Sequence, residues 1–168
     1  VVTNEIRRNN LIHYLLLMHE RKPKVLLVSE APGYLGMKLT GVPFSSERNL
    51  LYHPFYSGNK KFKVEFNGIT EPSATIVWKG LDSVGKIPLM FPAFPFHPHK
   101  AGNPKSNRPP TDEELGIGER YLKELIEMFG IKKFLAVGRK AESTLLKMNI
   151  HFSQAIFYQN LIYIQLFY

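Results

Sequence analysis

The residues best suited to chemistry follow an apolar run at positions 24–28, in the turn Ser29-Glu-Ala-Pro-Gly33. Glu30 is the only acid in this turn, and a carboxylate at a reacting centre stabilises a cation or orients a water molecule. The backbone N–H groups of such a tight turn are donors suited to an oxygen that gains negative charge. We therefore predict that Glu30 and the N–H groups around it, including those of Ala31 and Gly33, share one site.

Aromatic and histidine side chains supply a second group of candidates. Phe44 offers a flat face on which a planar ring can stack, although a Phe next to a Pro is equally compatible with a place in the core. His97 and His99 are separated by one proline, and together with His53 they are side chains of the type that binds metals. No acidic residue lies close to the pair in the sequence, so we predict no metal site and expect these histidines to border the site or to be structural.

Apolar runs and helical periodicity alternate along the chain. The run at 24–28 is typical of a strand buried on both faces of a parallel sheet. Further strands are predicted at 87–96, at 133–137 and within 155–168. Helices are predicted from a Ser73 cap to Gly85, from a Thr111 capping box to Gly130, and after Gly138.

Two segments flank the first strand. Residues 4–20 predict a helix with an apolar stripe, which is formed by Leu11, Ile12, Leu15, Leu16 and Met18. Residues 33–72 are rich in Gly, Asn, Ser and Pro, and we expect a long irregular excursion there. Such excursions are usually functional or disordered in compact domains.

The alternation of strands and helices predicts an α/β fold with a central, mostly parallel sheet. The length of 168 residues fits one domain, which we assign to residues 1–168. In such sheets ligands bind at the carboxyl ends of the strands. These ends are predicted at 29–33, 94–99 and 138–139, so we expect the site to lie among these three segments.

Positive charge is concentrated in the first two-thirds of the chain. The formal net charge is +8, and all of this excess lies in residues 1–110, because acids and bases are equal in number from residue 111 onward. A basic surface attracts polyanions. We expect nucleic-acid contacts from Lys38, Arg48, Lys105 and Arg108, with a merely solvated basic face as the alternative.

Several classes of protein are excluded by what the sequence lacks. There is no cysteine, which excludes disulfides, thiolate metal sites, cysteine-ligated iron–sulfur clusters and a cysteine nucleophile. Common nucleotide-binding and hydrolase motifs are absent, and we expect no cofactor. No run reaches the roughly 20 apolar residues of a membrane helix, and the first residues lack the pattern of a signal peptide. We therefore expect a cytoplasmic protein without a membrane partner.

Three blocks of residues resemble active-site motifs of the uracil-DNA glycosylase superfamily. They are the turn at 29–33 with Thr40-Gly-Val-Pro-Phe44, the segment Phe94-Pro-Phe-His-Pro-His99 with Asn107-Arg-Pro-Pro-Thr111, and Leu135-Ala-Val-Gly-Arg-Lys-Ala141. Together they span roughly residues 24–147, which is most of the chain. The resemblance implies a three-layer α/β/α sandwich around a central, mostly parallel sheet.

The same resemblance implies a monomeric DNA repair enzyme that acts without a metal or cofactor. Such an enzyme flips uracil or a related damaged base out of DNA and hydrolyses its N-glycosidic bond. Glu30 then assists catalysis, and Phe44 stacks on the base. The residues expected to bind the substrate are Ser29, Ala31, Pro32, Gly33, Gly41, Pro43, Phe44, Phe94 and His97.

Two positions depart from the family pattern. Pro92 stands where the family usually has an asparagine that contacts the base edge, and proline has no side-chain amide. The stretch 154–160 stands where the family has a His-Pro-Ser-type motif, with Tyr158 as the nearest substitute for its histidine. These departures leave open a catalytically weak or inactive homologue that binds nucleic acid. A small-molecule α/β hydrolase is a third alternative, and Glu30 as a solvated turn residue is the structural one.

Overall fold

A five-stranded sheet forms the centre of the protein. The computed structural model describes residues 2–58, 61–158 and 161–166. Within them the strands are β1 (Val25–Ser29), β2 (Leu89–Pro92), β3 (Lys133–Ala136), β4 (Ser153–Tyr158) and β5 (Leu161–Leu166), in the order β2-β1-β3-β4-β5. Only the β4–β5 pair is antiparallel. The predicted α/β fold with a mostly parallel sheet is confirmed.

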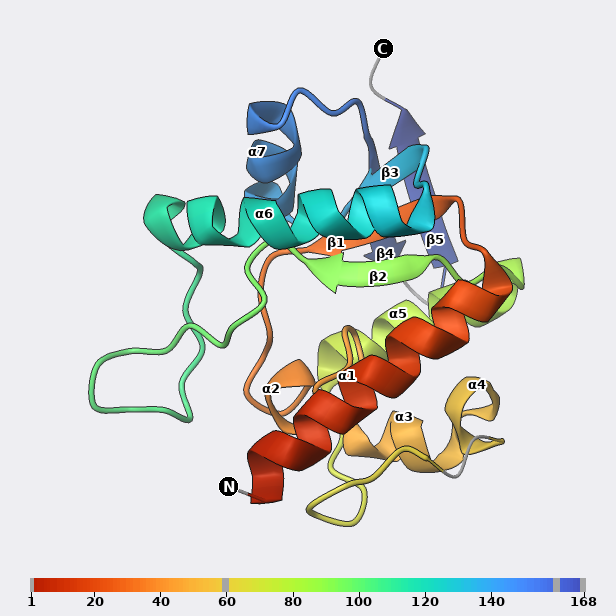
Figure 1. Cartoon of the computed structure of the whole chain (residues 1–168), viewed down its shortest axis with the longest axis vertical. Coiled ribbons are helices and arrows are strands. Elements are labelled where there is room, and N and C mark those ends of the chain that lie inside the picture. The colour runs from red at the N-terminus through yellow and green to blue at the C-terminus, as the bar shows by residue number, and fades with distance from the viewer. Residues whose placement is uncertain (1, 59–60, 159–160, 167–168) are drawn as a thin grey trace.

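Helices cover both faces of this sheet. They are α1 (Val2–Arg21), α2 (Met37–Thr40), α3 (Glu47–Tyr52), α4 (Pro54–Ser57), α5 (Pro72–Val84), α6 (Asp112–Phe129) and α7 (Arg139–Lys147). Figure 1 shows α6 and α7 on one face of the sheet and α1 and α5 on the other, which gives the three layers expected. Within the described ranges, every helix is too short or too polar to span a bilayer.

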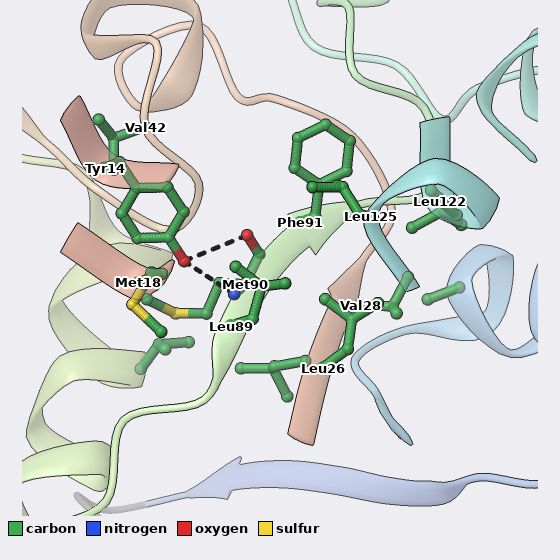
Figure 2. Packing of buried hydrophobic residues seen from close by; sticks show 14 of the residues in the cluster. Tyr14, Met18, Leu26, Val28, Val42, Leu89, Met90, Phe91, Leu122 and Leu125 are labelled. Carbon is green, nitrogen blue, oxygen red and sulfur yellow. Dashed lines mark hydrogen bonds between the residues drawn. The ribbon is translucent and has the colours of Figure 1, made fainter. Parts of the chain in front are cut away.

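α1 packs through only part of the predicted apolar stripe. Met18 is fully buried, as predicted, but Ile12 and Leu16 are 44% and 55% exposed, and Tyr14, which lies outside the stripe, is fully buried. The Tyr14 hydroxyl accepts a hydrogen bond from the Met90 N–H (2.8 Å) and donates one to the Met90 carbonyl (3.3 Å) (Figure 2). Because β2 is an edge strand, its outer backbone groups need polar partners, which an aliphatic stripe cannot supply.

The second strand is shorter than its apolar run. The ladder of β2 ends at Pro92, which pairs with Ser29. Two further hydrogen bonds hold the following residues to β1: Ala93 N–H donates to the Ser29 carbonyl (2.7 Å), and Phe94 N–H donates to the Glu30 carbonyl (3.1 Å). The carboxyl ends of β1 and β2 are therefore tied together where the candidate turn begins.

The helix caps agree with the sequence in one case and differ in the other. The Thr111 capping box forms as predicted, with Glu114 as its acid. α5 begins earlier than expected, because its cap is Glu71 and not Ser73. A carboxylate oxygen of Glu71 accepts a hydrogen bond from the Ala74 N–H at 2.5 Å.

The excursion at 33–72 is more regular than predicted, since it contains α2, α3 and α4. A buried carboxylate holds its far end in place. Glu47 is 1% exposed, and its two oxygens accept hydrogen bonds from the N–H groups of Glu65, Phe66, Gly68 and Ile69. The Glu47 carboxylate thus supplies the hydrogen-bond acceptors that a neighbouring strand would supply in a sheet. No local sequence pattern indicates this role.

Candidate active site

A cavity of about 680 Å³ lies between α5 and the carboxyl ends of β1 and β3. The turn 29–33 forms one wall, and Phe44, the first residues of α5, the turn 137–138 and residues of β4 complete it. The volume is in the usual range of small-molecule pockets. Of the three strand ends expected to form the site, the first and third line this cavity, and 94–99 lies behind its wall.

Glu30 reaches across the top of the sheet to the start of α7. Its Oε1 accepts a hydrogen bond from the Lys140 N–H at 3.1 Å, so the carboxylate meets the positive end of the α7 dipole. Gly138 makes this contact possible: its φ is +93°, and a Cβ added there would lie 2.5 Å from Glu30 Oε1. Glu30 is half-buried and lines the cavity, so the structure fixes its orientation without sealing it from a ligand.

Two residues of the turn after Glu30, Ala31 and Gly33, line the same cavity. Among the described residues, the N–H groups of Ala31 and Gly33 donate no hydrogen bond to another protein group. The Gly33 carbonyl, in contrast, accepts bonds from the Gly36 and Lys38 N–H groups (3.2 and 3.3 Å). The turn is thus held through its acceptors, and these two donors have no partner among the described residues.

Phe44 lines the cavity in a strained backbone conformation. Its φ is +46°, which is rare for a bulky residue and is held only when the surroundings enforce it. The Trp78 indole N–H donates to the Phe44 carbonyl at 2.8 Å. On the other side, the buried hydroxyls of Thr40 and Ser45 lie 2.7 Å apart, and Ser45 also donates to the Val42 carbonyl (2.8 Å). The backbone at Phe44 is therefore held in place, and Phe44 shares one cavity with Glu30.

Glu71 is a cavity residue that the sequence prediction missed. It lines the same space as Glu30, and its side chain packs so closely that a Cβ on Gly36 would lie 3.2 Å from Glu71 Cγ. The described lining therefore contains two carboxylates and no Lys, Arg or His. Carboxylates in such a place stabilise positive charge that develops beside them. The signal in the sequence was the acid directly before Pro72, at the position of an N-cap.

His97 contacts the wall of the cavity rather than its interior. Its Nδ1 lies 2.8 Å from the Pro32 carbonyl, so Nδ1 carries the proton and donates. Its Nε2 is buried without a partner among the described residues. His97 thus braces the 29–33 turn from behind, and Phe94 is buried in the core next to Phe96.

Gly41 and Pro43 also lie outside the cavity lining. Both are buried. Gly41 has a φ of +76°, and a Cβ there would collide with the Arg7 carbonyl of α1. Its role in the structure is to let α1 approach α2, so the Thr-Gly-Val-Pro-Phe motif shapes the wall and contributes Phe44 alone to the cavity.

The two positions that depart from the family pattern occupy different parts of the fold. Pro92 is buried in β2 and does not line the cavity. Ala155 and Ile156 of β4 do line it. The side chain of Tyr158 lies outside the described part of the structure.

The four predicted nucleic-acid contacts separate into two groups. Lys38 lies beside the turn, with its ammonium 4.3 Å above the Tyr34 ring, and Lys105 is exposed on the loop before Asn107. Arg48 instead stacks on Tyr52 (5.5 Å) beside a separate groove. These two placements leave Lys38 and Lys105 as the predicted cations nearest the cavity.

Arg108 is engaged within the protein. Its guanidinium donates to both carboxylate oxygens of Glu114 at 2.7 Å and to the His99 and Pro109 carbonyls. The hydrogen bonds from Arg108 lower the pKa of Glu114 to about 2. Arg108 therefore holds the 100–110 loop on α6.

The three histidines considered as metal ligands do not come together. His97 and His99 stack on each other with ring centroids 5.8 Å apart. His53 lies on Trp78, and its Nε2 is 3.2 Å from the Asp82 carboxylate. Within the described ranges no three His, Asp or Glu side chains are grouped as a metal site would require.

Comparison with known proteins agrees with this architecture. The sequence model described as "Uracil DNA glycosylase superfamily" matches residues 18–167. The crystal structure of wild-type Pedobacter heparinus SMUG2 is similar to this one, with a TM-score of 0.53 and 20% sequence identity. The match covers 76% of this chain and 58% of that chain. No curated protein matches the sequence. On the family match, which extends over most of its length, the chain belongs to the uracil DNA glycosylase superfamily.

Proposed function

We propose that this protein hydrolyses the N-glycosidic bond of uracil, or of a related damaged base, flipped out of DNA. The observation that supports this most is that Glu30, the turn residues 31–33 and Phe44, whose φ is positive, line one cavity. These are an acid, a pair of donors and a stacking face, which are the groups that base excision requires. Membership of the superfamily supports the same reaction class.

In this reaction the base enters the cavity and stacks on Phe44, while Ala31 and Gly33 N–H groups donate to its oxygens. The C1′–N bond breaks, and its electron pair leaves with the base. The oxygen of a water molecule then bonds to C1′ and releases one proton, which neutralises the departed base. Glu30 stabilises the cationic sugar between these two events. The hydrogen bond from Lys140 orients its carboxylate for this role.

We propose the remaining sequence-based expectations together with this reaction. DNA is the macromolecular partner, and the reaction uses no metal or organic cofactor. The acting unit is a monomer of one domain, and the cytoplasm is its expected location. The preferred base is uracil or a related lesion.

A second candidate is a homologue that binds nucleic acid with weak or no catalysis. Two observations favour it. The Glu30 carboxylate already accepts a hydrogen bond at the start of α7, as a purely structural cap would. Pro92 provides no amide for the base edge, and its side chain is buried in β2.

A gel assay on a uracil-containing oligonucleotide separates these candidates. Product that is cleavable at an abasic site supports the glycosylase, and a mobility shift without product supports the binder. No shift even at low salt favours a small-molecule hydrolase, because phosphate contacts strengthen as salt falls.

The decisive variant is Glu30→Gln, compared with Glu127→Gln on the exposed face of α6. Both remove one negative charge. We expect Glu30→Gln to lower the single-turnover rate by about 10²-fold or more, with DNA affinity unchanged, and Glu127→Gln to change neither. Equal loss of rate and affinity in Glu30→Gln would show that Glu30 is structural.

A further inference from the structure

Glu71, the second carboxylate of the cavity, uses one of its two oxygens within the protein and leaves the other one open. Its Oε2 accepts the hydrogen bond from the Ala74 N–H that caps α5. No described residue donates to its Oε1. Among the described residues, the fully buried side-chain polar atoms without a partner are Tyr56 Oη and His97 Nε2. Glu71 Oε1 is therefore accessible, and it is an open acceptor in the lining of the cavity.

Two close contacts place this acceptor beside the 29–33 turn and the segment that carries Phe44. A Cβ added to Gly33 would lie 4.0 Å from Glu71 Oε1, which is an ordinary van der Waals distance. A Cβ added to Gly36 would lie 3.2 Å from Glu71 Cγ and 3.2 Å from the carbonyl oxygen of Ser45, the residue after Phe44. Glu71 Oε1 thus lies next to Gly33 and close to the stacking residue.

A donor and an acceptor are therefore neighbours in this part of the cavity. The Gly33 N–H donates no hydrogen bond to a described residue, and a carboxylate oxygen can only accept. This pair complements a ring carbonyl that is next to a ring N–H, which is the lactam edge of bases such as uracil. An unprotonated ring nitrogen, such as N3 of cytosine, would instead face the carboxylate with a lone pair. Two acceptors left facing each other cost affinity.

Glu30 and Glu71 are anchored at different helices. Glu30 Oε1 accepts its hydrogen bond at the start of α7, whereas Glu71 Oε2 accepts one at the start of α5. The two carboxylates can therefore contact different parts of one ligand. Asn107 supplies a side-chain amide to the lining, but its oxygen already accepts a hydrogen bond from the Tyr34 N–H at 2.9 Å. Glu71 thus offers an acceptor beside the turn that the amide does not offer.

We propose that Glu71 determines which bases this cavity accepts. Its Oε1 accepts a hydrogen bond from the ring N–H of the base, while the Gly33 N–H donates to the neighbouring ring carbonyl. The substrate class is then the bases that carry a lactam edge. This deepens the proposed function and rests on it for the reaction that follows binding. Glu71 contacts the base edge, and it takes no part in bond cleavage.

The test compares the binding of 1-methyluracil and 1,3-dimethyluracil to the full chain by NMR titration. The methyl group on N1 takes the place of the sugar, so neither probe has a bond to hydrolyse. The methyl group on N3 removes the ring N–H. We expect it to weaken binding to the unmodified protein by about 10-fold or more, because a hydrogen bond to a charged group is lost.

The variant Glu71→Gln assigns this loss to Glu71. The Ala74 N–H needs an acceptor, so the amide oxygen of the new side chain stays at the cap and its NH₂ group faces the base. We expect 1-methyluracil to bind this variant about 10-fold more weakly. The second methyl group should then change the affinity by no more than about 2-fold, because the contact is already lost. A steric clash of that methyl group with the wall would persist in the variant.

Two further variants complete the design. Glu127→Gln on the exposed face of α6 removes a charge far from the cap and should behave as the unmodified protein does. Glu71→Asp keeps the charge and a residue that caps helices well, but it is one methylene shorter. It should also lose the discrimination between the two probes, and it decides the question if Glu71→Gln does not fold.

An unchanged penalty for the second methyl group in both Glu71 variants would overturn this role of Glu71. Failure of the unmodified protein to bind 1-methyluracil would overturn it as well. Single-turnover excision from a uracil-containing oligonucleotide keeps the two proposals apart. Loss of discrimination in the Glu71 variants of a protein that excises nothing keeps the specificity role and overturns the glycosylase. Excision with unchanged discrimination does the reverse.

Discussion

The two ends of the space beneath α5 have opposite characters. At the carboxyl ends of the strands lies the cavity with Glu30, Glu71 and the strained Phe44. At the amino ends, on the same face of β1, lies a groove of about 490 Å³. Its walls are mostly apolar side chains, such as Leu27 of β1 and Leu81 of α5, and its charged residues are cations only. Ala155 borders both spaces.

The two ends differ in the backbone conformations and the charges of the residues that line them. The groove at the amino ends is bounded by helix and strand residues and by the connecting residues 23–24 and 86–88, and none of its described lining residues has a positive φ. The cavity depends on Phe44 and Gly138, both with positive φ, and on carboxylates held at helix starts. Strain and half-buried charge persist where surrounding contacts enforce them, and such places are typically sites of function. Changes at the two ends should therefore separate activity from stability.

The largest effect is expected from Gly138→Ala at the cavity. The new Cβ would meet Glu30 Oε1 at 2.5 Å and force the carboxylate to move. A shift of about 1 Å in a catalytic group costs about 10²-fold in rate. Gly130→Ala is the control, because Gly130 also has a positive φ (+58°) but no atom within 4 Å of its Cβ position. Both variants should lose about 1 kcal/mol of stability, and only Gly138→Ala should lose turnover on the uracil oligonucleotide.

At the opposite end, Leu81→Ala should reverse this pattern. Leu81 of α5 is 3% exposed and belongs to the hydrophobic core. Its truncation enlarges the groove, and we expect a loss of about 2–5 kcal/mol in the free energy of unfolding, measured with urea. The single-turnover rate of the folded fraction should not change. A parallel fall in rate would mean that the two spaces beneath α5 are mechanically coupled.

The sequence predicts the parallel sheet and the cavity turn because both are encoded locally. A continuous apolar run is compatible with few structures other than a buried strand, and the Pro and Gly after it end that strand at 29–33. The Thr111 capping box is local in the same sense. Glu30 and Phe44 are found by their types and by the motif around them.

Residues that act through distant contacts leave no such local signal. Tyr14 is buried because β2, far along the chain, needs an edge partner. Glu47 is buried because its carboxylate accepts hydrogen bonds from the N–H groups of a loop some 20 residues later in the chain. A place in a family-like motif also does not guarantee a place in the cavity. Gly41 allows α1 to approach α2, and His97 donates a hydrogen bond to the Pro32 carbonyl.

A pair of variants at His97 tests whether its hydrogen bond to the Pro32 carbonyl positions the 29–33 turn. An Asn side chain can place an N–H near the position of Nδ1, whereas Gln reaches toward Nε2. We expect His97→Asn to keep the bond to the Pro32 carbonyl and the rate of excision. His97→Gln should lose about 1 kcal/mol of stability and about 10-fold in rate, less than a full misplacement of Glu30 would cost. Equal rates in the two variants would show that the bond does not position the turn.

The smallest effect concerns the rim of the cavity, where Arg108 and Glu114 hold the loop that carries Asn107. Hydrogen bonds from Arg108 lower the pKa of Glu114 from 4.5 to about 2. A carboxyl whose pKa is lower in the folded state stabilises the protein above its unfolded pKa, and this contribution is lost as the pH falls through the folded pKa. Glu114→Gln keeps a residue suited to the capping box but removes the charge.

The stability difference between the unmodified protein and Glu114→Gln should therefore be constant above about pH 4.5 and should shrink toward about pH 2. Its size should be at most about 1 kcal/mol, because the pair is partly exposed. Urea titrations at several pH values measure it. The salt dependence of oligonucleotide binding should be the same in both proteins. A weaker salt dependence in Glu114→Gln would mean that the Arg108–Glu114 pair supports nucleic-acid binding. The rim would then share the function of the cavity, unlike the groove at the amino ends of the strands.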